Sequence, residues 1–156
     1  MNMQPLVDWS PLLRMALLGI AIALGPLLWV WLRHRGASTT KRLHALTLLT
    51  LFLTFDLVLF GAFTRLSDSG LGCPDWPGCY GSASPLGAAS HIQAAQDSAP
   101  HGPVTHGKAW IEMIHRYLAM TVGALILVVT LASWAARRTL PLSPWWATGT
   151  LAWVLM

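Results

Sequence analysis

The sequence has little charge and few cysteines. Of its 156 residues only 10% are Asp, Glu, Lys or Arg, whereas soluble proteins carry about 25%. So little charge cannot cover a water-facing surface, and it also excludes intrinsic disorder, which requires low hydrophobicity and high charge. Two cysteines are too few for a disulfide-dense secreted scaffold. Glutamate occurs once, as Glu112.

Long apolar runs make up most of the chain: 54% of the residues are hydrophobic and the mean hydropathy is +0.54. A membrane-spanning helix needs about 20 mostly apolar residues. Three runs reach that length, at 12–32, 43–63 and 110–136. A fourth begins near Pro144 and is still apolar at Met156. We therefore predict an all-α, polytopic membrane helix bundle with three full transmembrane helices and a truncated fourth.

The basic residues lie in clusters at the ends of the apolar runs. One cluster lies within 33–42, and Arg137 and Arg138 form the other. Positive clusters beside membrane helices mark the cytoplasmic side, so the net charge of +4 is a topology signal and not a nucleic-acid-binding face. The loop 64–108, with basic residues only at its edges, is then extracytoplasmic. This predicts contact with membrane lipid and none with nucleic acid.

Turn-forming residues surround the two cysteines of this loop, Cys73 and Cys79. On the extracytoplasmic side a disulfide between them would persist. It would close a small ring, either as a structural staple or as part of a redox or substrate-handling loop that presents Trp76. Further along, 88–96 predicts a short surface helix. Three histidines have no trusted metal-ligand spacing and are expected to be solvent-exposed: His91, His101 and His106.

Three ionisable residues occur together at the start of the third apolar run: Glu112, His115 and Arg116. Ionisable residues in membrane helices are costly and are functional candidates. Glu112 and His115 share one helix face, which continues into small residues at Ala119 and Gly123. This pattern indicates a haem iron ligand at His115, with Glu112 beside it as proton acceptor or charge stabiliser. The alternatives are a buried histidine bonded to a backbone carbonyl and a simple Glu112–Arg116 ion pair.

Two further charged residues belong to the second apolar run. Asp56 lies deep in it, either as a buried neutral acid bonded to a neighbouring helix or as a proton relay. Arg65 closes the run and is a candidate for binding an anionic group such as a carboxylate.

Two motifs resemble a known family. They are GAFTRLSDSGLGCPDWPGCYG at 61–81 and EMIHR at 112–116. Together they resemble the N-terminal half of haem A synthase, in that family's order and topology, and the resemblance covers about 42–156. It implies eight-helix membrane enzymes of two similar four-helix halves. These oxidise the C8 methyl group of haem O to the formyl group of haem A by two successive hydroxylations, for terminal oxidases.

The resemblance implies roles for individual residues. His115 corresponds to the first haem-ligating histidine of the N-terminal pair, and Glu112 to a glutamate required for activity. Arg116 and Arg65 are expected to contact haem, and Cys73 and Cys79 correspond to an extracytoplasmic cysteine pair. The cofactors are then haem O as substrate and haem b, and the location is a bacterial plasma membrane. Haem O synthase is the expected partner, with a homo-oligomer left open.

The domain prediction follows from where the resemblance starts. Residues 1–41 are predicted to be an extra N-terminal anchor and cytoplasmic link, and 42–156 the N-terminal half of the bundle. The second histidine ligand is expected beyond Met156, so the chain alone is expected to be inactive. Two alternatives stay open: a non-enzymatic b-type membrane cytochrome, and a membrane thiol oxidoreductase, which the five residues between the cysteines disfavour.

Overall fold

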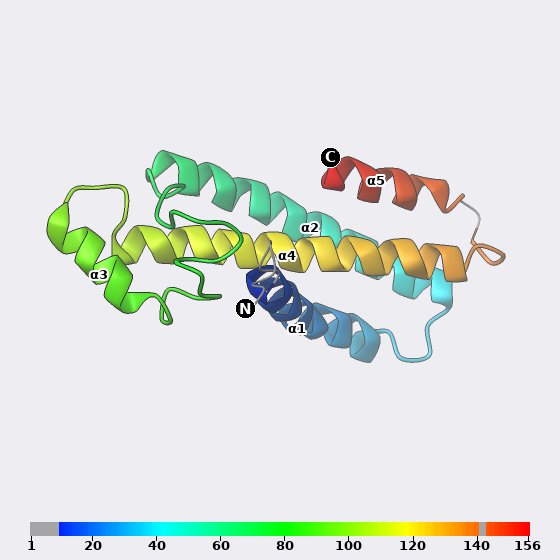
Figure 1. The fold of residues 1–156 in the computed structure, drawn as a ribbon. Helices are drawn as coiled ribbons and strands as arrows, with labels where there is room; N and C mark the ends of the chain where they lie inside the picture. The colour runs from blue at the N-terminus through cyan, green and yellow to red at the C-terminus, as the bar shows by residue number, and fades with distance from the viewer. Residues whose placement is uncertain (1–9, 141–142) are drawn as a thin grey trace, which may run out of the picture. The chain divides into compact units, whose positions relative to one another are not determined.

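The computed structural model describes residues 10–140 and 143–156. Within them the chain forms five helices and no strand, so the predicted all-α fold class is confirmed (Figure 1). The helices, in chain order, are α1 (Ser10–Arg33), α2 (Thr39–Leu66), α3 (Ala89–Ser98), α4 (His106–Ala135) and α5 (Trp145–Leu155).

Three of these helices, α1, α2 and α4, are long and apolar enough to cross a membrane. They match the three runs predicted from hydropathy, except that α4 ends at Ala135, one residue before the end of the third run. The chain is a multi-pass membrane protein. Each helix begins before its apolar run, because polar residues can continue a helix outside the hydrocarbon layer; α2 begins at Thr39, four residues before Leu43. The predicted fourth segment is α5, with 11 residues.

The chain divides into two compact units. One combines the described residues up to Leu18 with Leu59–Tyr117, and the other combines Gly19–Val58 with Leu118–Met156. This division does not test the predicted anchor at 1–41, which stays a prediction, and its residues 1–9 lie outside the described part of the chain.

The second unit has a small core made by three helices. Ala23 and Val30 of α1, Leu46 of α2 and Leu125 of α4 are buried against one another. The last helix attaches to α4 through polar contacts: Trp134 Nε1 donates to Thr148 Oγ1 at 2.9 Å. A side chain–side chain hydrogen bond of this kind orients a helix where apolar packing alone does not discriminate between lipid and protein.

Helices α1 and α4 approach each other closely at Gly19. A Cβ built on Gly19 would lie 2.6 Å from the Cβ of Met120, closer than real Cβ atoms come to other atoms. Thr121 Oγ1 also donates to the Gly19 carbonyl at 3.5 Å. With Ala23 four residues on, Gly19 forms the small-residue spacing that lets membrane helices pack backbone to backbone.

Replacing Gly19 with leucine is expected to separate α1 from α4. The new side chain has no space at Met120, and overpacking costs about 1–3 kcal/mol. The measurement is unfolding by sodium dodecyl sulfate in mixed micelles, followed by circular dichroism. Gly25→Leu is the matched control, because nothing lies within 4 Å of a Cβ at Gly25. Equal losses in the two variants would contradict this packing.

Candidate functional site

The Cys73–Cys79 segment is a closed and shaped loop. The two cysteines form a disulfide with a Cα–Cα distance of 4.9 Å, and both are buried. Inside the ring, the carboxylate of Asp75 accepts hydrogen bonds from the backbone amides of Tyr80 and Gly81. The disulfide weighed from the sequence is thus present. Trp76, at the tip of the ring, is 69% exposed.

Helix α4 holds this ring through an ion pair. Glu112 and Arg116 pair directly, as their spacing of four residues allows. The second carboxylate oxygen of Glu112 accepts the backbone amide of Cys73 at 2.8 Å. The guanidinium of Arg116 donates to the backbone carbonyls of Asp75, at 2.8 Å, and of Gly78. Glu112 is only 6% exposed. The pair therefore binds the loop backbone as both acceptor and donor.

Two more contacts fix the loop on the same face of α4. The hydroxyl of Tyr117 donates to the carbonyl of Ala83 at 2.7 Å. The backbone at Gly72 touches the first turns of α4, where a Cβ would lie 2.5 Å from the carbonyl carbon of Lys108 and 2.6 Å from the amide nitrogen of Ala109. Only glycine allows backbone to approach backbone this closely.

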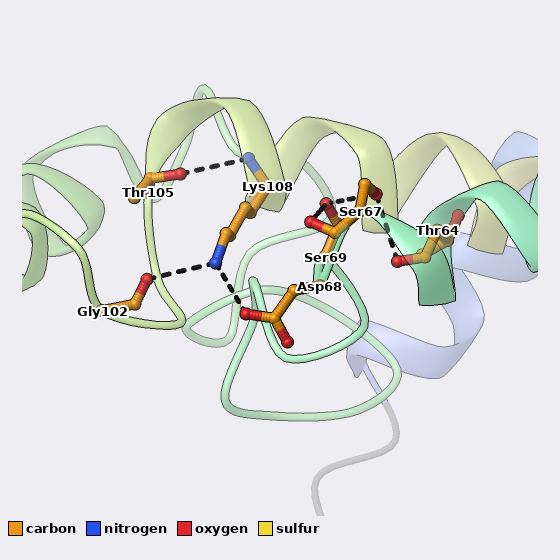
Figure 2. Close-up of polar contacts among 7 residues, drawn as sticks. All are labelled: Thr64, Ser67, Asp68, Ser69, Gly102, Thr105 and Lys108. Carbon is orange, nitrogen blue, oxygen red and sulfur yellow. Dashed lines mark hydrogen bonds and ion pairs between the residues drawn. The ribbon is translucent and has the colours of Figure 1, made fainter.

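The start of the loop is tied to the start of α4 by a lysine (Figure 2). Lys108 Nζ lies 3.0 Å from Asp68 Oδ2 and also donates to the carbonyl of Gly102. Beside it the hydroxyls of Ser67 and Ser69 bond to each other at 2.9 Å. Because the Asp68 side chain is 85% exposed, this ion pair contributes little stability.

His115 does not face the loop; it faces the end of α2. Its imidazole is half-buried and lies nearly parallel to the Phe60 ring, with centroids 6.4 Å apart. A Cβ built on Gly61 would lie 2.9 Å from His115 Nε2. Among the described residues no hydrogen bond reaches either ring nitrogen, so the alternative of a histidine bonded to a carbonyl is not what the structure shows. Glu112 and His115, predicted on one face, contact different neighbours.

The two arginines named from the sequence differ in their contacts. The guanidinium of Arg116 donates hydrogen bonds to Glu112 and to two loop carbonyls. Arg65 is exposed and makes no side-chain hydrogen bond or ion pair within the described ranges. It lies one helical turn beyond Gly61, on the α2 face that meets His115.

The expectation that Asp56 is buried was wrong. Asp56 is exposed and makes no hydrogen bond or ion pair with any described residue. Asp56 lies about 120° around the helix from Thr50, the buried residue of this stretch. The described residues thus include no hydrogen-bonded neighbour of Asp56 on another helix.

The loop histidines bear out most of the expectation. His91 and His101 are exposed, and the predicted surface helix is α3. His106 is different, because it begins α4 and its Nε2 lies 3.1 Å from Gln93 Oε1. No group of three His, Cys, Asp or Glu residues suited to a metal ion occurs among residues 10–140 and 143–156.

Sequence reasoning missed the structural roles of Gly61, Gly72 and Asp75. All three lie in the quoted 61–81 motif, but none was assigned a role. A glycine inside the Leu- and Phe-rich α2 was the available signal for Gly61, because glycine in a helix interior costs about 1 kcal/mol and is kept where something approaches closely. No comparable signal pairs Asp75 with the amides that follow it.

Residues 44–156 match a family model described as cytochrome oxidase assembly protein. The Heme A synthase of Shewanella oneidensis is 48% identical over 81 residues, which cover 52% of this chain and 24% of that protein. The Heme A synthase of Mesorhizobium japonicum is 32% identical over 117 residues, covering 68% of this chain and 32% of that protein. No solved structure matches.

The chain thus spans about a quarter to a third of the length of the curated relatives it matches. The matched region begins at residue 44 and contains both motifs, with all the residues that contact the Cys73–Cys79 ring. The family match covers well over half of the chain. The chain belongs to the family described as cytochrome oxidase assembly protein, the haem A synthase family that its two motifs predict.

Proposed function

We propose that this chain takes part in haem A biosynthesis, as the part of a haem A synthase that contains His115. In the proposed reaction the C8 methyl group of haem O is oxidised to the formyl group of haem A by successive hydroxylation. The observation that carries the proposal is the half-buried imidazole beside Gly61, one turn from Arg65, because neither side chain has a hydrogen-bond partner among the described residues. The names of the relatives support it.

The described residues fit a haem by donor type. Imidazole is a common haem iron ligand, and His115 has both ring nitrogens free of hydrogen bonds within the described residues. Arg65 suits a carboxylate, because a guanidinium presents paired donors to it. The chemistry supplied by bound haem is that of the oxidisable methyl group and the iron. His115 and Arg65 then hold and orient the substrate.

The proposed catalytic role of Glu112 requires that one of its present hydrogen bonds opens. Both of its carboxylate oxygens already accept hydrogen bonds, one from Arg116 and one from the Cys73 amide. An oxygen becomes available to a substrate only when one of these contacts opens. The contacts seen here also make Glu112 a positioning residue for the loop. A substitution that keeps one role and removes the other separates the two.

The test co-expresses the complete protein that carries this sequence with haem O synthase, and separates the extracted haems by chromatography. We expect haem A or its hydroxylated precursor from the wild type and none from His115→Ala or Glu112→Ala. Glu112→Gln keeps an acceptor for the Cys73 amide. Loss of haem A in Glu112→Gln supports the catalytic role if the disulfide of this variant is reduced as slowly as in the wild type, which shows that the loop is still held. Retention of haem A leaves only the positioning role.

The cytochrome alternative has its own outcome in the same experiment. If the wild type yields only haem b or haem O, and His115→Ala merely loses bound haem, the chain is a haem carrier and the synthase proposal fails. The described residues disfavour the thiol oxidoreductase alternative, because both cysteines are buried and therefore hidden from a partner thiol. Expressed alone, the 156-residue chain is expected not to convert haem O, since it spans only about a quarter to a third of the length of its relatives.

Location and partners complete the proposal. The proposed location is a bacterial plasma membrane, with the basic residues of 33–42 and Arg137 and Arg138 on its cytoplasmic side; the positive charge of these clusters supports this orientation. The loop 64–108 is then extracytoplasmic, where its disulfide is stable. Haem O synthase is the proposed partner, because an insoluble substrate is best passed directly, and co-purification of the two enzymes tests it. Native mass spectrometry tests whether the protein that carries this sequence forms a homo-oligomer.

A further inference from the structure

Six glycines lie inside the described helices, and their surroundings differ. A Cβ built on any of four of them would meet nothing within 4 Å: Gly25, Gly107, Gly123 and Gly149. Gly19 meets Met120 of α4, which is helix packing. Gly61 meets a histidine ring, with Nε2 at 2.9 Å and the two neighbouring ring carbons at 3.6 Å. At Gly61, therefore, the ring of a candidate haem ligand occupies the space that a side chain would take.

The contact at Gly61 decides where the imidazole lies. A real Cβ does not come within 3.0 Å of another atom, so any side chain at this position excludes the present place of Nε2. The excluded atom is the far end of a flexible side chain and not backbone. The ring therefore gives way while the two helices stay in place, and a larger residue at position 61 changes the ligand's orientation before it changes the fold.

One aromatic ring lies next to the imidazole. Phe60 is nearly parallel to it, at an interplanar angle of 14°, with the ring centroids 6.4 Å apart. Phe60 is itself held against Phe63, with centroids 5.8 Å apart. A ring pushed away from Gly61 must leave its present side-chain rotamer or slide along Phe60. Either movement takes the imidazole nitrogen away from one defined position.

We propose that Gly61 is a positioning residue: its missing side chain sets the place and orientation of the His115 imidazole as a haem ligand. The inference rests on the proposed function, because it takes His115 as the ligand. Gly61 acts through His115 and needs no contact with haem. Its effect on haem binding must therefore depend on the presence of the imidazole.

The experiment titrates the 156-residue chain in detergent with hemin and records the Soret band. Gly61→Ala is expected to weaken hemin binding about tenfold and to shift the band, the order of effect when a ligand ring must leave its rotamer to bind. Gly25→Ala is the matched control, a helical glycine with open surroundings, and is expected to titrate like the wild type. Circular dichroism checks that the variants keep their helix content.

Repeating the Gly61→Ala substitution in a His115→Ala chain separates an effect on the imidazole from an effect on helix packing. In chains carrying His115→Ala, adding Gly61→Ala is expected to change hemin affinity by less than about twofold, since coupled residues lose their interaction when one is removed. Wild-type binding by Gly61→Ala, or an equal loss in both backgrounds, would overturn the inference. If His115→Ala itself binds hemin like the wild type, the ligand assignment fails instead, and the two failures are thereby distinguished.

Discussion

Replacing Arg116 with alanine is expected to release the disulfide loop from α4. The change leaves the Glu112 carboxylate without its cation and removes the donors of the Asp75 and Gly78 carbonyls. The two paired side chains are only 13% and 8% exposed. Breaking such a pair from one side costs about 3–5 kcal/mol, because the remaining charge stays buried without a partner.

The release can be followed through the disulfide. Cys73 and Cys79 are 4% and 0% exposed, so a phosphine reductant reaches them only when the loop opens. A loss of about 3 kcal/mol raises the open population, and hence the reduction rate, by about 100-fold. Thiols trapped with an alkylating reagent and counted by mass spectrometry give the rate.

Two variants accompany Arg116→Ala. Arg116→Lys keeps the charge opposite Glu112 but cannot present several donors at once, and an intermediate rate is expected. Arg14→Ala removes an arginine that has no side-chain partner among the described residues, and its rate should equal that of the wild type. An unchanged rate in Arg116→Ala would mean that the ring is held by its own bonds and not by α4.

Replacing Gly72 with alanine is expected to have a comparable effect from the opposite side of the contact. The new methyl group would lie 2.5 Å from the Lys108 carbonyl carbon and 2.6 Å from the Ala109 amide nitrogen. These are backbone atoms of a helix and cannot turn aside. The loop must move instead, and the neighbouring Cys73 amide loses Glu112. Overpacking of this kind costs about 3 kcal/mol, the upper end of the usual range.

Gly70→Ala is the matched control for this prediction. Gly70 lies two residues earlier in the same loop, and a Cβ there meets nothing within 4 Å. The reduction rate of Gly70→Ala should stay near that of the wild type, whereas Gly72→Ala should reduce far faster and unfold at lower sodium dodecyl sulfate. Matching rates for the two alanine variants would show that the close approach at Lys108 does not hold the loop.

The long helices and the Glu112–Arg116 pair were predictable because both depend on short spacings. Apolar length alone identifies a membrane helix, and a separation of four residues brings two side chains together on any helix. Lys41 and Arg42 correctly marked where the second apolar run begins but not where α2 begins, since a charged first turn can lie outside the membrane. Hydropathy therefore predicts spans better than helix ends.

The partners of that pair could not be predicted. Cys73 meets Glu112 across 39 residues, and Arg116 meets Asp75 across 41. The intervening loop has no hydrophobic periodicity to set a register. Its contacts are made through backbone amides and carbonyls, which every residue carries, so no side-chain pattern reveals them. Asp56 failed for a related reason: depth in the membrane follows from sequence position, whereas the inward face depends on neighbouring helices.

The short span of the Cys73–Cys79 ring has a consequence for the order of events during assembly. The cysteines are six residues apart, so the ring closes through a local encounter. Its closure needs no contact with Glu112, which lies 33 residues after Cys79. The loop can thus be oxidised before α4 packs against it. Helix α4 then packs against a loop that already has its final shape. If oxidation came later, α4 would have to pack before the loop had that shape.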